Sequence, residues 1–166
     1  MTLEVVKQFT RIAYEGVDFL IPSEYIVAGF YQHIQDDAPS VYYNRETLPH
    51  IHLTRLLEEE FKCQRRMESG VILVLRMQDF ANDVCVSISD YTNTAFPASG
   101  FLALSINGEI QSEPIECSEI RQMPLSIRTR LNSCGIDGIR FPEGRQKQLL
   151  IAPDLLIRKF FAGALL

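Results

Sequence analysis

The sequence predicts a mostly β protein made of two small barrel-like lobes with short flanking helices. Most of the chain divides into short apolar or alternating runs bounded by Gly, Pro, Asn and Asp, as strands separated by turns require. Two distant segments also repeat one pattern, in which a polar turn is followed by a strand and then by a helix that opens with a Leu-Leu pair. Two related lobes, each closed by a helix, account for both observations.

The N-terminal part of the chain predicts three strands. Residues 6–14 partly alternate polar and apolar side chains, as a half-buried strand does. Glu15-Gly16 then turns the chain into a second strand at 17–21, which completes a hairpin. Pro22-Ser23-Glu24 breaks this strand, and the β-branched and aromatic run at 25–31 predicts a third.

The next stretch predicts a second hairpin that leads into a helix. Strands are expected at 41–43 and 47–52, with a turn at Asn44-Arg45-Glu46. From Leu53 the apolar period changes to that of a helix, with one face formed by Leu53, Leu56, Leu57 and Phe61.

The central segment predicts further strands. The nearly continuous apolar run at 71–75 suits a strand that is buried on both faces. Residues 84–88 follow a turn signal and form the next expected strand. Asn107-Gly108 is a favoured two-residue hairpin turn, so we expect residues 101–104 to pair with a strand near Ile110.

The C-terminal segment predicts a helix, a hairpin and a final helix. Pro124 suits the first position of a short helix that reaches Asn132, with Leu125, Ile127 and Leu131 as its apolar face. Strands at 136–141 and 146–151 flank Pro142-Glu143-Gly144, and Pro153 opens the last helix.

The repeated pattern joins residues 48–61 to residues 147–160. Leu56-Leu57 in the first segment corresponds to Leu155-Leu156 in the second, and Phe61 and Phe160 keep the same offset. The repeat predicts two related lobes, although strand-to-helix junctions also resemble one another because they share capping chemistry.

Composition indicates a folded, cytoplasmic protein. Apolar residues make up 46% and charged residues 22%, and the formal charge of −5 argues against unaided nucleic-acid binding. No basic segment precedes an apolar run at the start, and no apolar run is long enough to span a bilayer, so neither secretion nor membrane insertion is expected. The four cysteines form no CxxC pair and are expected to be reduced.

Three segments resemble the CheW-like family, the adaptor domains of bacterial chemotaxis arrays. Residues 19–27 (Phe-Leu-Ile-Pro-Ser-Glu-Tyr-Ile-Val) are similar to its early strand pair. Residues 48–57 (Leu-Pro-His-Ile-His-Leu-Thr-Arg-Leu-Leu) are similar to its "I-P-V-V-D-L-x-x-x-L" segment, with His52 where the family has aspartate. Residues 138–156 are similar to its glycine-led hairpin followed by "L-L-L-D". The likeness covers roughly residues 5–160.

The resemblance implies a single domain, residues 1–166, with two intertwined β lobes and no active site or cofactor. It also implies an adaptor that couples a histidine kinase to receptors. The partners would be the kinase's regulatory domain and a chemoreceptor's cytoplasmic tip or another adaptor. Where the family has an Asn-Leu-Arg-Gly-Arg-like turn, this chain has five residues that we take as the expected protein-binding site: Tyr42, Tyr43, Asn44, Arg45 and Glu46. Tyrosine and arginine are also enriched at binding hot spots.

Two other hypotheses come from the residues. The first is a small β-barrel module that binds an anion or nucleotide through the basic residues of the C-terminal third: Arg121, Arg128, Arg130, Arg140, Arg145 and Lys147. The second is a hydrolase with Cys134 as nucleophile, because arginines lie near it in the sequence. For the basic residues we prefer the simpler interpretation of a solvated basic face, and for Cys134 that of a buried thiol without catalytic function.

Two histidines could form part of a metal site. His50 and His52 lie two residues apart in a predicted strand, so their side chains share a face, as metal ligands can. A third ligand could be His33 or one of residues 58–60, but no spacing ties these residues together. No metal is therefore expected, and no motif for catalysis or for nucleotide phosphates is found.

Overall fold

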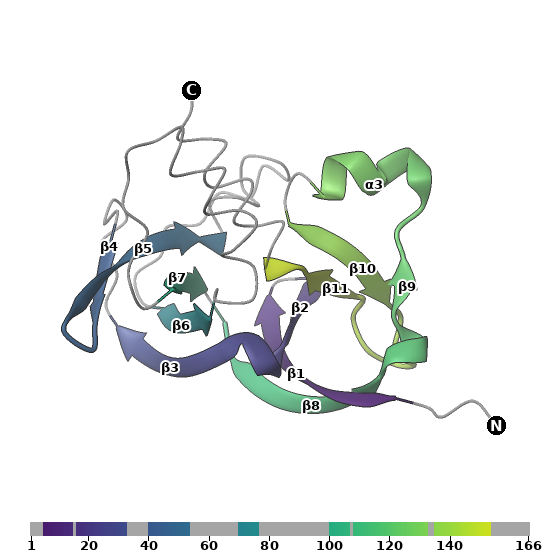
Figure 1. Ribbon diagram of the computed structural model, residues 1–166. Coiled ribbons are helices and arrows are strands. Elements are labelled where there is room, and N and C mark those ends of the chain that lie inside the picture. The colour runs from purple at the N-terminus through teal and green to yellow at the C-terminus, as the bar shows by residue number, and fades with distance from the viewer. Residues whose placement is uncertain are drawn as a thin grey trace. The chain divides into compact units, whose positions relative to one another are not determined.

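The computed structural model of the chain describes residues 5–14, 16–32, 40–53, 70–76, 100–106, 108–132 and 135–153. These residues form two β-sheets, one in each of two compact units (Figure 1). Unit 1 comprises residues 1–25 and 108–156, and unit 2 comprises residues 26–107 and 157–166. The mostly β class that the sequence predicts is confirmed.

The sheet of unit 1 has six strands and joins segments from both ends of the chain. Its order is β8-β1-β2-β11-β10-β9. All neighbours are antiparallel except β2 and β11, which are parallel. The predicted hairpins β1–β2 and β10–β11 are confirmed. The strands are β1 (Val6–Tyr14), β2 (Val17–Pro22), β8 (Ile110–Glu116), β9 (Arg121–Gln122), β10 (Ile136–Arg140) and β11 (Gln148–Ile151).

Short helices connect the strands of unit 1. Single 3₁₀ turns occupy η1 (Ser23–Tyr25), where the sequence predicts a strand break, and η2 (Cys117–Glu119). The predicted helix is α3 (Leu125–Asn132), and the Pro124 carbonyl oxygen accepts hydrogen bonds from the backbone of Ile127 and Arg128. Leu125 is 82% exposed and Ile127 is also exposed, so these two positions form no buried face, contrary to the sequence-based expectation. Met123, just before the helix, is the side chain buried there.

The sheet of unit 2 has five strands in the order β3-β6-β7-β5-β4. Only β5 and β7 are parallel neighbours. Every described side chain of the predicted doubly buried run, residues 71–75, is buried, which confirms that prediction. The strands are β3 (Ile26–Gln32), β4 (Ser40–Tyr43), β5 (Glu46–His52), β6 (Gly70–Arg76) and β7 (Phe101–Ile106).

Alternation along the strands gives each unit its own apolar cluster. In unit 1 Phe9, Leu20 and Ile115 are buried together, with Ile120 and Leu150 packed against them. In unit 2 the buried members come from β4 to β7 and are Val41, Leu48, Ile72, Val74 and Ala103. Full burial of one such side chain contributes about 1.5–3 kcal/mol, so these clusters are the main source of stability in the described residues.

The hairpin predicted at Asn107-Gly108 is wrong. β7 pairs with β6 and β5 in unit 2, whereas β8 pairs with β1 in unit 1, so the chain passes from one sheet to the other at this point. Gly108 is needed for a different reason. Its φ is +149°, and a Cβ there would lie 2.1 Å from the carbonyl oxygen of Ala13, whose N–H donates to Glu109. The glycine permits this close backbone approach rather than a two-residue turn.

The two segments that repeat in the sequence occupy matching places in the two sheets. β5 and β11 each form the second strand of a hairpin, and each is the parallel partner of another strand in its sheet. The first hairpin, β1–β2, lies in unit 1 while β3, β4 and β5 lie in unit 2. The antiparallel pair β6 and β7 lies in unit 2 while β8 to β11 lie in unit 1. Each half of the chain therefore supplies strands to both sheets.

Three predicted elements lie outside the described residues. They are the helix that continues from Leu53, the strand at 84–88 and the helix that continues from Pro153.

Replacing Gly138 with alanine should destabilise unit 1. The added Cβ would lie 2.8 Å from Ile120 Cγ2, 3.3 Å from Leu150 Cβ and 3.4 Å from the Arg121 carbonyl oxygen. Overpacking of this kind lowers the free energy of unfolding by about 1–3 kcal/mol. Chemical denaturation should detect the loss, whereas Ser126→Ala on the exposed first turn of α3 should change stability by less than about 0.5 kcal/mol. Equal stability of both variants would contradict the packing at Gly138.

Candidate functional site

The expected protein-binding residues lie on the hairpin that joins β4 to β5. Tyr43 pairs with Glu46 and Tyr42 pairs with Thr47, so only Asn44 and Arg45 form the turn. Both have positive φ, 47° and 66°, which is the signature of a type I′ turn. The predicted turn is therefore present, and Glu46 belongs to β5 instead of to the turn.

The second turn residue is unusual for this conformation. Type I′ turns favour asparagine at the first central position and glycine at the second. Asn44 fits the first position, but Arg45 holds the second with a Cβ that crowds the backbone. A non-glycine residue in the left-handed region costs roughly 1–2 kcal/mol. Arg45 is thus kept in a conformation that glycine would adopt without this cost.

Tyr42 and Tyr43 have different roles because successive strand residues point to opposite faces. The centroid of the Tyr43 ring lies 6.0 Å from that of Phe30, with the rings stacked, and 6.3 Å from that of Phe101, with the rings edge to face. Phe30 belongs to β3, at the other end of the sheet order, so the sheet curves until its two edge strands share this aromatic contact. Tyr42 is 69% exposed. Tyr43 is therefore partly buried against the apolar cluster of unit 2, and Tyr42 projects from the surface.

The residues that remain on the surface define what we call the hairpin tip: Tyr42, Asn44, Arg45 and Thr47, all of which are exposed. The tip combines an aromatic ring, a guanidinium and small polar groups. Among the described residues Arg45 forms no ion pair, and neither do the exposed Arg76 and Arg121. Arg11, Arg128, Arg140 and Arg145 each pair with a carboxylate. The tip therefore presents a cation that the described part of the chain does not neutralise.

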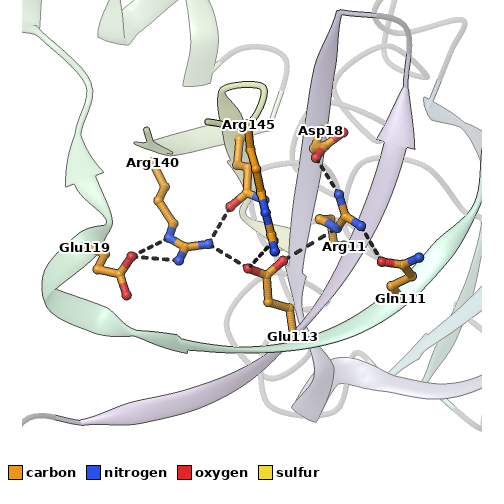
Figure 2. A network of polar contacts seen from close by, with 8 residues as sticks. Arg11, Asp18, Gln111, Glu113, Glu119, Arg140 and Arg145 are labelled. Carbon is orange, nitrogen blue, oxygen red and sulfur yellow. Dashed lines mark hydrogen bonds and ion pairs between the residues drawn. The ribbon is translucent and has the colours of Figure 1, made fainter. Parts of the chain in front are cut away.

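The C-terminal arginines take part in a polar network across the sheet of unit 1 (Figure 2). Glu113 Oε1 accepts from Arg140 Nη1 at 3.0 Å and from Arg145 Nη1 at 3.3 Å. Glu119 Oε2 lies 2.7 Å from both Nε and Nη2 of Arg140. Burial alone would lower the pKa of Arg140, but the hydrogen bonds and charges of Glu113 and Glu119 outweigh it and raise the pKa. Arg140 is therefore a fully charged structural cation.

The network continues to the N-terminal hairpin. Arg11 Nη1 donates to Asp18 Oδ2 at 3.0 Å, Arg11 Nε lies 3.5 Å from Glu113 Oε2, and Arg11 also donates to Gln111. The Asp18 side chain is only 6% exposed, so the ion pair with Arg11 offsets part of the cost of burying it. In Figure 2 Glu113 lies between Arg11 on one side and Arg140 on the other, and it links the two ends of the network.

This network bears on the anion-binding hypothesis. Arg140 and Arg145, two of the six basic residues it rests on, bind carboxylates of the protein itself, and Arg128 lies 4.0 Å from Asp137. Arg121 and Lys147 are exposed, and the Arg130 side chain lies outside the described residues. No observation brings these basic groups together around a free anion site.

The structure adds no support for a metal site at His50 and His52 or for a nucleophile at Cys134. His50 and His52 do share a face, with ring centroids 4.1 Å apart, but His50 is buried and His52 Nδ1 lies 2.9 Å from Ser105 Oγ. No group of three or more potential metal ligands occurs within the described ranges. His33, residues 58–60 and Cys134 fall outside them.

Sequence reasoning missed the Arg11–Asp18–Glu113 core of the network. A signal was present, because Arg11 shares the alternation phase of Phe9, an inward residue of β1. The partner could not be identified, since the register that places Gln111 beside Arg11 and Glu113 beside Phe9 joins strands from distant parts of the chain.

Within the described ranges, no helix is long and apolar enough to cross a membrane.

The two tyrosines should respond oppositely to truncation. Tyr43→Ala removes a partly buried ring packed against Phe30 and Phe101. We expect the free energy of unfolding to fall by about 2–3 kcal/mol, less than the loss of about 3–5 kcal/mol for a fully buried aromatic. Tyr42→Ala should change it by less than about 0.5 kcal/mol, as exposed positions do. Urea unfolding of both variants tests this, and similar losses at the two positions would contradict the assignment of faces.

Glu113→Gln should destabilise unit 1 because three arginines lose their shared charge. Hydrogen bonds to charged groups are worth about 1.5–3 kcal/mol each, and we expect a total loss of about 2–3 kcal/mol. Glu119→Gln is the matched control, since Glu119 is more exposed and contacts only Arg140 among the described ion pairs. Its effect should stay below about 1 kcal/mol. A larger loss for Glu119→Gln than for Glu113→Gln would overturn the central place of Glu113.

Comparison with known proteins identifies the fold. No family model matches the chain, and a search of curated proteins finds no match. Among solved structures, the chain is similar to the scaffolding protein CheW from Thermoanaerobacter tengcongensis, with a TM-score of 0.57 at 12% sequence identity. The match covers 93% of this chain and 90% of that one. The predicted resemblance is confirmed at the level of the fold: the chain has a divergent CheW-like fold, mostly β and built on two sheets.

Proposed function

We propose that the protein is a non-catalytic adaptor that couples a histidine kinase to receptors in chemotaxis-type signalling. The observation that carries this proposal is the match to a scaffolding protein over almost the whole length of both chains. The match concerns the fold, and a fold can serve several functions. The character of the hairpin tip adds support, because it offers recognition chemistry without a catalytic constellation.

The partners in this proposal are the regulatory domain of a histidine kinase and a chemoreceptor's cytoplasmic tip or another adaptor. The chain would act in the cytoplasm as one domain, residues 1–166, with two intertwined lobes. It would need neither a cofactor nor a metal. Recognition would depend on surface contacts, which suits a protein whose described charged clusters are satisfied internally.

The hairpin tip has the properties that protein recognition requires. Exposed tyrosine and arginine are the residue types that dominate binding hot spots. The tip is also held in one conformation, because Val41 and Leu48, a pair just behind it, are buried and Tyr43 is anchored by two aromatic rings. A preorganised surface loses less conformational entropy when it binds. We place the protein-binding site at Tyr42 and Arg45, with Tyr43 as the residue that holds them in position.

The anion-binding alternative is less well supported. It needs a cluster of unpaired cations in the C-terminal third, and the network around Glu113 already engages two of them. No specific contact favours a small ligand over a protein partner.

Charge reversal at the tip should separate binding from stability. We expect Arg45→Glu to weaken binding of the regulatory domain of the chemotaxis histidine kinase from the same cell at least about tenfold, or about 1.4 kcal/mol. The Tm should stay within about 2 °C, because glutamate and arginine are similarly strained in the left-handed region and the site is exposed. Isothermal titration calorimetry and thermal unfolding measure the two effects.

Arg76→Glu is the matched control, since Arg76 is exposed at the end of β6 in the same unit. It changes the net charge equally and should bind like wild type. If wild type binds no kinase regulatory domain, the proposed function fails. If Arg45→Glu and wild type bind equally, the function can stand but the site is wrong.

A further inference from the structure

We propose that unit 1 binds one internal water molecule between the side chains of Gln148 and Asp18. The site lies within the polar network of unit 1, and the chemistry of the two groups beside it selects the ligand. The inference does not depend on the proposed function, because it concerns only the inner contacts of one sheet.

Gln148 and Asp18 are neighbours on adjacent strands. In the parallel pairing of β11 with β2, Gln148 lies opposite Asp18 and Leu150 lies opposite Leu20. Paired residues point to the same face of a sheet, and so do residues two apart on one strand. Leu20 belongs to the apolar cluster of unit 1 and Leu150 packs against it, so Gln148 and Asp18 lie on the face that carries this cluster. Both are buried, with exposed fractions of 0% and 4%.

The orientation of the Gln148 amide follows from its contact with Arg140. Arg140 Nη1 lies 2.8 Å from Gln148 Oε1, and because a guanidinium can only donate, the amide oxygen must face it. The amide nitrogen Nε2 therefore points elsewhere, and it is buried without a hydrogen-bond partner in the described part of the chain. Buried donors are rarely left without an acceptor, because their lost hydration costs free energy. An acceptor is therefore expected beside Nε2.

The other contacts of the network lead from Gln148 back to Asp18. Arg140 Nη1 also donates to Glu113 Oε1 at 3.0 Å, and Glu113 Oε2 lies 3.5 Å from Arg11 Nε. Arg11 Nη1 donates to Asp18 Oδ2 at 3.0 Å, as Figure 2 shows. These five side chains form a ring of polar contacts that is open only between Asp18 and the Nε2 atom of Gln148. The group that fills this place must accept from an amide and donate to a carboxylate.

Charge and hydrogen-bonding capacity select water for this place. The three arginines of the network are balanced by three carboxylates, so no further ion is required: Arg11, Arg140 and Arg145, with Asp18, Glu113 and Glu119. An anion that accepted from Nε2 would be repelled by Asp18, and a cation on Asp18 would face an amide donor. Water accepts one hydrogen bond and donates another, and buried waters typically bridge polar groups that are otherwise unsatisfied. This bridge would join the hairpin β1–β2 to the hairpin β10–β11.

Water–protein NMR on ¹⁵N-labelled wild type tests the site. The Nε2 protons of Gln148 should give cross peaks to water with opposite signs in NOESY and ROESY spectra, as dipolar contact with a long-lived water requires. Proton exchange would instead give the same sign in both spectra. Gln146, which is exposed in the same hairpin, is the internal control and should show no long-lived water. Absence of the dipolar cross peaks at Gln148 overturns the inference.

Two variants test the position of the water within the network. Asp18→Ala removes the second partner of the water, so the dipolar cross peaks of Gln148 should be lost. Glu119→Gln is the matched control, because it removes a carboxylate charge that contacts Arg140 at 2.7 Å but does not adjoin the proposed site. It should keep the cross peaks. Their retention in Asp18→Ala, or their loss in Glu119→Gln, overturns the bridge.

A crystal structure of the wild-type chain provides a test that needs no folded variant. At a resolution that shows ordered solvent, one water should lie within about 3.2 Å of both Gln148 Nε2 and a carboxylate oxygen of Asp18. A direct hydrogen bond between these two side chains, or a dry contact between them, overturns the inference.

Discussion

Two parallel strand pairings, β11 with β2 and β5 with β7, are the constraint on which both sheets depend. Hairpins form between neighbours in the sequence, but a parallel pair needs a long crossover. In unit 1 the pairing joins strands near opposite ends of the chain, and it sets Leu150 beside Leu20 in the apolar cluster. The cluster is complete only when the C-terminal hairpin has returned to the N-terminal one. Stability of unit 1 is thus tied to a contact between segments far apart in the sequence, and many such contacts slow folding.

The hairpin tip shows how a sheet can hold a strained surface. Because strand residues alternate, the same four-residue strand buries Val41, packs Tyr43 partly buried on the same side and exposes Tyr42. The Phe30–Tyr43 contact links the two edge strands of the sheet, so the turn beyond Tyr43 is fixed by packing on its inner side. Strain at Arg45 can be maintained because the buried residues contribute more free energy than the turn loses. The surface chemistry of the tip therefore depends on the buried residues behind it.

Local signals predicted much of the fold, and long-range register explains most of the rest. The β1–β2, β4–β5 and β10–β11 hairpins were predictable because each turn and its flanking strands are contiguous. The hairpin predicted at Asn107-Gly108 was wrong because the glycine permits a close backbone approach to Ala13 instead of a two-residue turn. At the candidate site the turn between the two strands was predictable, but the division between Tyr42 and Tyr43 was not. That division depends on which face of β4 meets Phe30, a residue of another edge strand.

The described arginines separate into those that pair with a carboxylate and those that do not, and this separation limits where an acidic group could bind. Arg11, Arg140 and Arg145 surround Glu113, so each is already engaged with its charge compensated. An acidic partner that approached them would have to displace an intramolecular carboxylate and leave it partly buried without its cations, which is unfavourable. Arg45 imposes no such penalty, because no described carboxylate competes for it. Specificity in this fold can therefore arise as much from the arginines that are neutralised as from those left exposed without a described ion pair, which are Arg45, Arg76 and Arg121.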